Sequence, residues 1–409
     1  MEYPNLRHVR LFCACVRSGS LTQAAESVAV SQPAASQAIT RLEAFYGSQL
    51  LERHQRQTTP TADGLILQAR AMRALEFIRS GCQRLRAGAA SGSLPAETRL
   101  TIGHLAVLQA LDHAGGFMGA AAVLGQSVAA VQRMARNAEA VLEAALFEMD
   151  GRSLRLTASG RMAARWSALA LRELKNAGEE LQESRGLFDG LVSIGALPMA
   201  RTTIVPDAIA LLAGNRPGAR FEIIEGSYEQ LLGDLEMGHV DLLIGALRDR
   251  IPAALVQEPL FEFRLSLVAR CGHPLASQGR LALADLARFP WVVARKGTPN
   301  RGIFDSLAAR FADRNNVLGT VETGSLTALR GILQQSDRLA LLSRHQIRHE
   351  LLAGSLTVLD FPLSQTPRMV GMTMRRDWYP TSLQGECLEA VRRVVALEEG
   401  CGGQMHAAG

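Results

Sequence analysis

The sequence predicts a multi-domain protein in which small all-α modules precede a larger α/β domain. Three observations lead to this prediction. Apolar residues recur at helical spacing through roughly the first 185 residues, whereas buried-strand patterns alternate with helical ones from Gly190 onward. The first module also recurs about one hundred positions later. A chain of 409 residues has room for about two to four domains.

The first module is organised around residues 31–43. Ser31 can cap the start of a helix, and Pro33 is tolerated in its first turn. An apolar stripe predicts the inward face: Ala35, Ile39 and Leu42. The other face carries short and amide side chains, which suit base edges and phosphates because glutamine can pair with adenine and arginine with guanine or phosphate. An ordinary amphipathic helix is the plainer alternative for this stretch taken alone.

The flanking residues make this helix part of a larger motif. Upstream, Ser20 and Gln23 form a capping box for a short helix, and a tight turn follows. Helix, tight turn and second helix define a helix-turn-helix, whose second helix enters the major groove of DNA. Residues 6–16 predict a preceding helix. Residues 50–64 predict a short basic hairpin, or wing, after which Thr61 caps a further helix.

Together these residues resemble the winged helix-turn-helix domain of LysR-type transcriptional regulators. The positions that carry the resemblance are dense and ordered: Ala24-Ala25, Ser31-Gln32-Pro33-Ala34-Ala35-Ser36, Ile39, Leu42-Glu43, Gly47, Leu50-Leu51, Arg53, Thr61 and Gly64. The resemblance implies a sequence-specific DNA-binding regulator of transcription. Pro60 departs from the family pattern, which usually has leucine there, and this change bears on the pairing of the wing's strands.

The expected partner is a double-stranded DNA operator. The candidate DNA-binding residues are Thr22, Gln32, Pro33, Ala34, Ser36, Gln37, Thr40, Arg41, Arg53 and Arg56. The distribution of charge supports DNA binding. The whole chain carries a net charge of +5, and the segment through Arg86 accounts for all of it, because it contains 11 arginines and 6 acidic residues. A solvated basic face is the plainer interpretation, but its coincidence with the motif favours DNA.

A long helix follows the wing from residue 63 to about residue 86. Its apolar line includes Leu65, Ala69, Met72, Ile78, Cys82 and Leu85. A single helix cannot bury such a line alone. By resemblance this is the linker helix through which LysR-type regulators dimerise, so we expect a homodimer or homotetramer. A flexible break rich in glycine, alanine and serine then follows.

A second module repeats the first without a gap after a shift of 96 positions. Identical pairs include Ser31/Ser127, Glu43/Glu139, Leu50/Leu146, Arg56/Arg152, Thr61/Thr157 and Gly64/Gly160. The second copy has lost groups that would touch DNA, since Gln32 becomes Val128 and Arg53 becomes Met149. We interpret it as a folded winged helix used mainly for dimer packing or weak DNA contact. The rival interpretation is that both copies read DNA.

From Gly190 the pattern of strand, helix, strand, helix and strand predicts a parallel sheet with crossover helices. This order over about two hundred residues resembles the effector-binding domain of LysR-type regulators. That domain is a type II periplasmic-binding-protein-like clamshell of two lobes. Motifs that carry the resemblance include Asp241–Ile244, Glu258-Pro259-Leu260 and His273–Ala276. Lobe one would comprise roughly residues 186–263 and 364–397, and lobe two roughly residues 264–363.

A ligand in such a domain lies between the lobes, at carboxyl ends of strands and amino ends of helices. Three stretches that open predicted helices qualify: 198–203, 296–301 and 323–325. Their hydroxyls and free N–H groups favour an anion, and we expect a carboxylate-bearing small molecule. The candidate effector-binding residues are Pro198, Met199, Thr202, Lys296, Thr298, Asn300, Thr323 and Ser325. Ordinary helix capping is the alternative for Thr202, Thr298 and Ser325 taken singly.

The sequence thus divides into six segments. We expect a DNA-binding domain at 1–62, a linker helix and break at 63–95, a second winged-helix-like module at 96–160, a second linker helix at 161–185, an effector domain at 186–397 and a disordered tail at 398–409. Six cysteines without paired spacing fit a reducing cytoplasm, and no apolar run reaches membrane length.

The sequence gives little support for an enzymatic function. P-loop, nucleophile-elbow and HExxH motifs are absent, so we predict neither an enzyme nor a cofactor. His345 and His349 share a predicted helix face but have no third metal ligand on another element. The alternative function is a ligand-binding or dimerisation protein that has lost operator contact.

Overall fold

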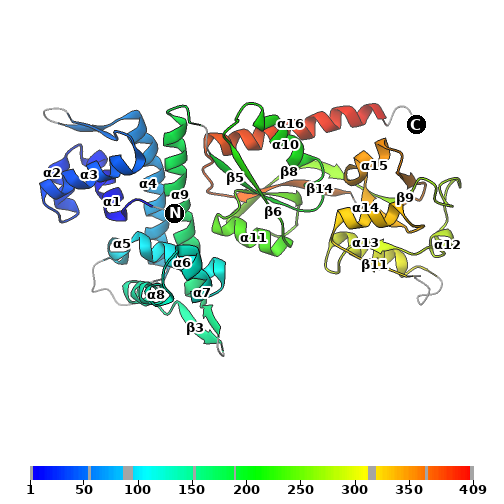
Figure 1. Ribbon diagram of the computed structural model, residues 1–409, viewed down its shortest axis with the longest axis horizontal. Coiled ribbons are helices and arrows are strands. Elements are labelled where there is room, and N and C mark those ends of the chain that lie inside the picture. The colour runs from blue at the N-terminus through cyan, green and yellow to red at the C-terminus, as the bar shows by residue number, and fades with distance from the viewer. Residues whose placement is uncertain are drawn as a thin grey trace.

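The computed structural model describes residues 3–53, 57–85, 95–150, 153–187, 190–311, 319–363 and 367–405. Two helical modules pack against a pair of long helices, α4 (Ala62–Leu85) and α9 (Ala158–Glu183), and an α/β domain lies on the other side of α9 (Figure 1). Among the described helices, none combines the length and the apolar character that crossing a membrane requires.

The first module consists of three helices and a hairpin. Its elements are α1 (Leu6–Ser18), α2 (Leu21–Ser27), α3 (Gln32–Tyr46), β1 (Leu51–Arg53) and β2 (Thr58–Pro60). The two strands pair antiparallel with Leu51 opposite Pro60, so the proline is accommodated at the last position of its strand. The N–H of Thr61 then donates to the carbonyl of Leu50 at 3.1 Å, which ties the hairpin to the start of α4.

A similar order of elements lies between α4 and α9. It comprises α5 (Ala96–Arg99), α6 (Ile102–Ala114), α7 (Phe117–Leu124), α8 (Val128–Leu142), β3 (Phe147–Asp150) and β4 (Ser153–Leu156). Most of the expected flexible break falls on residues 86–94, outside the described residues. The buried apolar residues of both modules and of the two long helices form one continuous core.

The helices α4 and α9 pack against each other in antiparallel orientation. At one end the hydroxyl of Ser184 donates to the carboxylate of Asp63 at 2.9 Å. At the other end Gly81 lies so close to Trp166 that an added Cβ would sit 2.3 Å from the indole Cδ1. The expected apolar line of α4 was partly wrong: Leu65 and Met72 are 55% and 56% exposed, because α9 covers a neighbouring face of α4.

The α/β domain contains two larger sheets. Lobe one has the strand order β6-β5-β7-β14-β8, and lobe two has the order β12-β9-β13 with a separate β10-β11 pair. The strands are β5 (Leu191–Ala196), β6 (Arg220–Ile224), β7 (Leu242–Ala246), β8 (Leu255–Phe263), β9 (Leu265–Arg270), β10 (Val292–Val293), β11 (Val321–Glu322), β12 (Ala340–Ser343), β13 (Leu356–Leu359) and β14 (Arg368–Arg375). As expected, β5, β6 and β7 are parallel, whereas β14 runs antiparallel to β7 and β8.

The helices of this domain flank the sheets and mark its end. They are α10 (Ile204–Ala213), α11 (Tyr228–Met237), α12 (Leu283–Leu286), α13 (Pro299–Ala308), α14 (Leu326–Gln334), the 3-10 turn η1 (His345–Ile347), α15 (Arg348–Leu352) and α16 (Ser382–Met405). The last helix continues past residue 397, where we expected a disordered tail to begin, and residues 406–409 lie outside the described residues.

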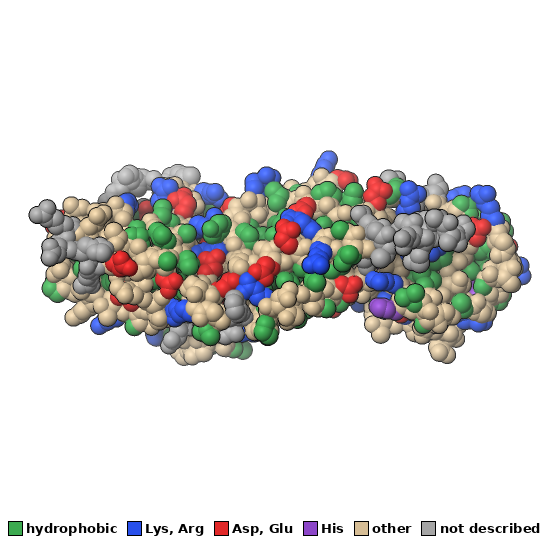
Figure 2. All heavy atoms as spheres, turned by 90° about the horizontal axis from the view of Figure 1, so that it is seen from above, with side chains coloured by type: hydrophobic (Ala, Val, Ile, Leu, Met, Phe, Trp, Pro, Cys, Tyr) green, Lys and Arg blue, Asp and Glu red, His purple; other side chains and the backbone are tan. Residues whose placement is uncertain are grey.

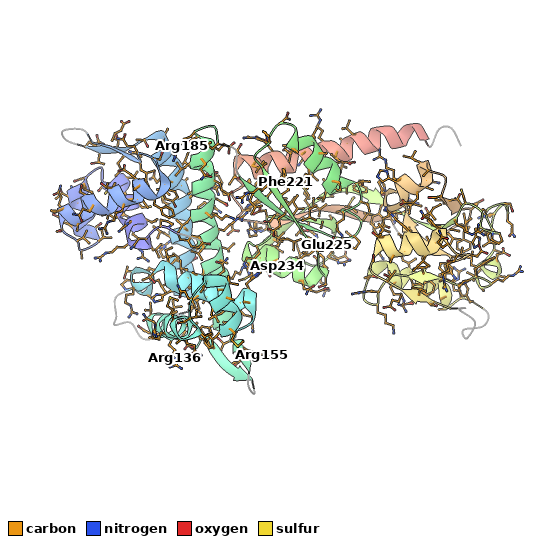
Figure 3. The ribbon with its side chains drawn as sticks, viewed as in Figure 1. Arg136, Arg155, Arg185, Phe221, Glu225 and Asp234 are labelled. Atoms are coloured by element: carbon orange, nitrogen blue, oxygen red, sulfur yellow. The ribbon has the colours of Figure 1, made fainter. Side chains whose placement is uncertain are left out.

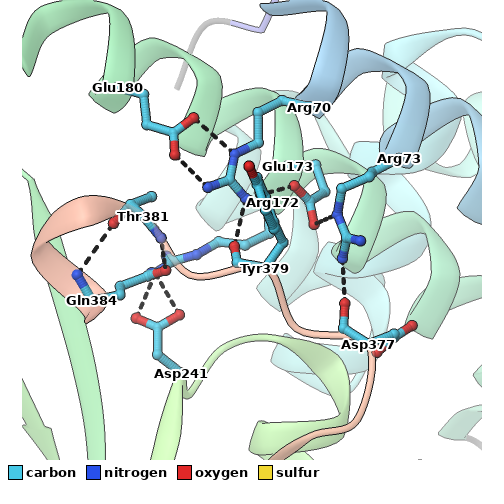
Figure 4. A network of polar contacts seen from close by, with 10 residues as sticks. All are labelled: Arg70, Arg73, Arg172, Glu173, Glu180, Asp241, Asp377, Tyr379, Thr381 and Gln384. Atoms are coloured by element: carbon cyan, nitrogen blue, oxygen red, sulfur yellow. Dashed lines mark hydrogen bonds and ion pairs between the residues drawn. The ribbon is translucent and has the colours of Figure 1, made fainter. Parts of the chain in front are cut away.

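A buried polar network fixes the α/β domain to the two long helices (Figure 4). Arg70 of α4 donates to Glu173 at 2.9 Å and to Glu180 at 2.5 Å, both on α9. It also donates to the carbonyl of Tyr379, between β14 and α16, at 2.6 Å. Nearby, Arg172 of α9 donates to both carboxylate oxygens of Asp241, at 2.8 and 2.7 Å. The guanidinium groups of Arg70 and Arg172 therefore join the helix pair to lobe one.

We expect Gly81→Ala to destabilise the helix pair. The added methyl group would overlap the indole ring of Trp166, a rigid group that cannot move aside cheaply, so the free energy of unfolding should fall by about 1–3 kcal/mol. Denaturant unfolding measures this change. The matched control is Gly233→Ala on the exposed face of α11, where nothing lies within 4 Å and a gain of about 0.5–1 kcal/mol is expected. Equal stability of the two variants would contradict the predicted packing.

Candidate nucleic-acid interface and interlobe effector site

Local capping sets the geometry of the helix-turn-helix. The hydroxyl of Ser20 accepts the N–H of Gln23 at 3.4 Å and so begins α2. The hydroxyl of Ser31 accepts the N–H of Ala34, also at 3.4 Å, and begins α3. Between them Ala29 adopts a left-handed conformation with φ of 53°, which makes the sharp turn that the sequence predicts. The caps and the turn are thus as expected, except that of the capping box only the hydrogen bond from the Gln23 N–H to Ser20 is present.

The two faces of α3 differ as the sequence predicts. The residues Ala35, Ile39, Leu42 and Tyr46 are buried in the core. The opposite face exposes the candidate residues Gln32, Pro33, Ala34, Gln37, Thr40 and Arg41, with Ser36 half-buried and Thr22 exposed on α2. The hydroxyl of Thr40 donates to the carbonyl of Ser36 at 3.1 Å, so its donor is already used within the helix. The polar face is thus directed away from the protein.

Two neighbours of this face were missed by the sequence reasoning. His8, at the second position after the helix α1 begins, has its pKa lowered by burial and by the nearby charges of Arg41 and Arg7. Arg7 is exposed. The N-terminus of α1 therefore adds a second cation beside Arg41, which no local motif would have indicated. Of the wing candidates, Arg53 ends β1, its side chain is not among those described, and Arg56 lies outside the described residues.

Glu43 of α3 holds the wing against that helix. Its carboxylate accepts the N–H groups of Leu50 and Leu51 at 2.9 and 3.3 Å. Gly64 follows the wing at a point where an added Cβ would lie 2.1 Å from the carbonyl oxygen of Leu50, so only glycine fits there. Arg185, beyond the end of α9, donates to the carbonyl of Tyr46 at 2.7 Å and so fixes the C-terminus of α3.

The second module has matching internal contacts but a different outer surface. Glu139 accepts the N–H groups of Leu146 and Phe147 at 2.9 and 3.2 Å, as Glu43 does in the first module. Side chains on α7 and at the start of α8 are apolar and exposed: Met118, Val123 and Val128. Further along α8, Arg133, Arg136 and Asn137 are exposed, and Arg155 lies on the wing (Figure 3). Arg152 lies outside the described residues.

In lobe one, the stretch after β5 reaches the other lobe. Ser343, at the end of β12 in lobe two, is buried and its hydroxyl lies 3.6 Å from the sulfur of Met199. Pro198 is exposed, and the hydroxyl of Thr202 donates to the carbonyl of Met199 at 2.7 Å, which makes a turn rather than a helix cap. The N-cap of α10 is Thr203, whose hydroxyl is buried and has no hydrogen-bond partner among the described residues.

The remaining effector candidates gather in lobe two. Glu322 accepts the backbone N–H of Lys296 at 3.2 Å and pairs with Arg301 at 2.6 Å, which brings the loops before α13 and α14 together. Thr298 and Ser325 cap these helices, the role that the sequence left open for each. The hydroxyl of Thr323 accepts the N–H of Ser325, and Asn300 is half-buried in the first turn of α13. All these hydrogen bonds stay within lobe two.

Interlobe residues missed by the sequence reasoning lie at the end of β12. The amide oxygen of Gln346 accepts the N–H of Ser343 at 3.1 Å, and both side chains are buried. The ring of His345 lies 5.0 Å from that of Phe261, at the end of β8. Ser343 is the last residue of strand β12, so the rule that pointed to residues 198–203 could also have found it. Among the described residues, no group of three or more His, Cys, Asp or Glu could hold a metal ion.

Two family matches cover most of the chain. The LysR substrate binding domain matches residues 185–396. The bacterial regulatory helix-turn-helix protein, lysR family, matches residues 6–65 and also residues 102–161. The chain belongs to the LysR family of bacterial transcriptional regulators. A substrate-binding domain in a regulator of this family implies a small-molecule effector rather than a catalytic reaction.

Individual relatives agree with this assignment. The HTH-type transcriptional regulator GalR of Pseudomonas putida is 31% identical over 97% of this chain and 98% of its own length. PcaQ of Agrobacterium fabrum, also an HTH-type transcriptional regulator, is 26% identical over 73% of this chain and 96% of its own length.

Solved structures share the fold. Full-length OxyR from Pseudomonas aeruginosa has a TM-score of 0.54 and 19% identity, and covers 73% of this chain and 95% of its own. Full-length LysG from Corynebacterium glutamicum, solved with its bound effector arginine, has a TM-score of 0.51 and 18% identity, and covers 73% of this chain and 99% of its own.

We expect Glu43→Ala to loosen the wing. Removal of the carboxylate leaves the N–H groups of Leu50 and Leu51 without their acceptor, at a cost of about 1–3 kcal/mol for each buried donor. Hydrogen exchange followed by mass spectrometry should show faster exchange at these two amides. The control, Glu26→Ala on the exposed surface of α2, should leave their exchange unchanged. Unaltered protection in the Glu43 variant would show that other contacts hold the wing.

Proposed function

We propose that this regulator recognises its operator through the outer face of α3, with Thr22, Arg41, Arg53 and Arg56 at its margin. The observation that carries the proposal is the separation of the faces of α3, because the apolar side is buried while Gln32, Gln37 and their neighbours are exposed. Glutamine can donate and accept hydrogen bonds at one base, so this surface suits the major groove. The added cation Arg7 beside Arg41 supports contact with a phosphate.

A double substitution tests the operator contact. Gln32→Ala with Ser36→Ala removes side chains from the outer face of α3 without touching the core, and each base contact contributes about 1–3 kcal/mol of discrimination. Electrophoretic shift with the DNA upstream of its own gene, against unrelated DNA, should show that the preference for the upstream DNA falls about tenfold or more. The matched control is Ser277→Ala with Gln278→Ala, which are exposed in lobe two. If the variant with Gln32→Ala and Ser36→Ala retards the upstream DNA as strongly as the unaltered protein does, the proposed roles of Gln32 and Ser36 are contradicted.

We further propose that the effector carries a carboxylate and binds between the lobes. Thr203 supports this proposal, because its hydroxyl is buried at the first turn of α10, lacks a partner among the described residues and follows the stretch that contacts Ser343 of lobe two. A helix N-terminus with an available hydroxyl favours an anion. Pro198, Met199 and Thr202 lie beside it, and the lobe-two candidates Lys296, Thr298, Asn300, Thr323 and Ser325 would complete the site on closure of the lobes.

Calorimetry with carboxylic acids and their amides tests this proposal. Acids that bind should bind more tightly than the corresponding neutral amides, because only the acid carries the charge that the α10 N-terminus favours. Thr203→Val should weaken acid binding by roughly tenfold or more, since a hydrogen bond to a charged group is lost, and Thr203→Ser should retain it. Equal binding of an acid and its amide would contradict the carboxylate assignment, and unchanged affinity in the valine variant would exclude Thr203.

We also propose that residues 96–160 are a duplicated winged helix-turn-helix module. The support lies in paired contacts 96 positions apart. Thr61 and Thr157 each donate to a carbonyl at 2.8 Å and each cap a long helix, and a Cβ on Gly160 would meet the carbonyl oxygen of Leu146 at 2.0 Å, as one on Gly64 would meet that of Leu50. Several relatives match nearly their whole length on 73% of this chain, and the remainder is about the size of one module with its long helix.

A further inference from the structure

The two long helices carry different groups at positions that are 96 residues apart. Arg70 of α4 corresponds to Trp166 of α9, and the two carboxylates that bind Arg70, from Glu173 and Glu180, correspond to Phe77 and Arg84. Gly81, which accommodates the indole ring of Trp166, corresponds to Ala177. Helix α9 therefore supplies the carboxylates that Arg70 of α4 requires, and α4 supplies the space that Trp166 of α9 requires. Neither helix carries the groups that would fit a second copy of itself.

This difference selects against pairing of like helices. Two antiparallel α4 helices would place Arg70 opposite Phe77 and Arg84, where a guanidinium that is fully buried in this structure would meet no carboxylate. An uncompensated buried charge costs several kcal/mol. Two α9 helices would place Trp166 against Ala177, whose Cβ fills the space that Gly81 leaves open. Pairing of α4 with α9 is thus favoured by its own ion pairs and packing, and also because pairs of two α4 or two α9 helices are disfavoured.

The first module also contacts the start of the second. The guanidinium of Arg10 on α1 donates to the carbonyls of Thr98 and Leu100 at 3.2 and 3.1 Å. Because α4 and α9 run antiparallel and each follows its own wing, the two modules lie toward opposite ends of the pair (Figure 1). The arrangement is that of two related modules about an approximate two-fold axis, which is the symmetry that a DNA duplex offers to paired recognition helices.

The middle of α8 exposes a cationic and polar stretch. Arg133, Arg136 and Asn137 face solvent, and Glu139 holds the wing of this module as Glu43 holds the first. The loss of Gln32 to Val128 removes a base-reading group, but the arginines along α8 remain able to contact phosphates. Figure 2 shows basic and acidic side chains interspersed over the face that it draws.

We propose that one chain is by itself a two-headed DNA-binding unit, in which α4 pairs with α9 of the same chain and α3 and α8 contact successive turns of one duplex. The inference rests on the proposed operator binding through α3. It gives the second module a defined partner, the phosphate backbone one helical turn, about 10 base pairs, from the first contact.

Footprinting of the full-length protein tests the second contact. The unaltered chain should protect two segments of the upstream DNA about one helical turn apart. Arg133→Ala with Arg136→Ala should remove protection of one segment, keep the other and lower the slope of affinity against salt by about 2, since each phosphate contact contributes about 0.9. The control is Arg280→Ala with Arg310→Ala, exposed in lobe two, which removes the same charge elsewhere. It should leave both segments and the slope unchanged.

The outcomes separate this inference from the proposed function. Two protected segments and an unchanged slope in the Arg133 and Arg136 variant would overturn the inference, while operator binding through α3 would stand. A single protected segment in the unaltered chain would also overturn it. No protection on any DNA would overturn both proposals.

Cross-linking tests whether the helix pair forms within one chain. Asp63→Cys and Ser184→Cys place thiols on side chains that are 2.9 Å apart, in a Cys271→Ser background because Cys271 is exposed. A short bismaleimide should give a cross-linked product of single-chain size in the double variant. Co-expression of one chain with Asp63→Cys and another with Ser184→Cys should give no covalent dimer. A covalent dimer from the co-expressed chains would show that the helices pair between chains and would overturn the proposal.

Discussion

The buried guanidinium of Arg70 is the interaction on which the arrangement of the molecule depends. Its side chain is fully buried, and it reaches α9 through Glu173 and Glu180 and lobe one through the carbonyl of Tyr379. Burial acts to lower the pKa of Arg70, but the hydrogen bonds and charges of Glu180 and Glu173 raise it above its usual value, so the group stays charged. Separating α4 from α9 would leave this buried charge unpaired, and separating lobe one would remove its carbonyl acceptor, so the three parts are held together.

This constraint ties lobe one directly to the helix pair. Lobe one continues into α4 and α9 through Arg70 and through Asp241, which binds Arg172 and also accepts the N–H of Ser193 on β5 at 2.9 Å. Lobe two meets lobe one through a shared apolar core, at the Met199–Ser343 contact and where the rings of Phe261 and His345 lie together. A ligand that binds one lobe arrangement better shifts the population toward it. Strand β5 leads from Ser193 directly to the proposed effector stretch, so a change there has a contiguous route to the two helical modules.

Much of this organisation follows from local chemistry that the sequence contains. Ser31, the turn at Ala29 and the stripe of α3 specify their geometry within a few residues, and the strand and helix order of the α/β half follows from hydrophobic period alone. The contacts between distant segments do not. The buried face of α4 depends on which helix covers it, so Leu65 and Met72 are exposed while the charged Arg70 is buried. In the same way Thr203, rather than Thr202, occupies the N-cap position of α10, because Thr202 is held in the preceding turn by its hydrogen bond to Met199.

The asymmetry between the modules has a consequence for the operator. At positions where the first module exposes Thr22 and Gln32, the second exposes Met118, 79% accessible, and Val128, 37% accessible. These apolar groups offer nothing to base edges or phosphates, whereas Arg133 and Arg136 offer charge without the paired donor and acceptor of glutamine. The proposed two-module unit would obtain affinity from both modules but base discrimination mainly from the first. The operator that suits the proposed unit would therefore be asymmetric, with one half-site defined by sequence and a second that tolerates substitution as long as the phosphates stay in register with α8.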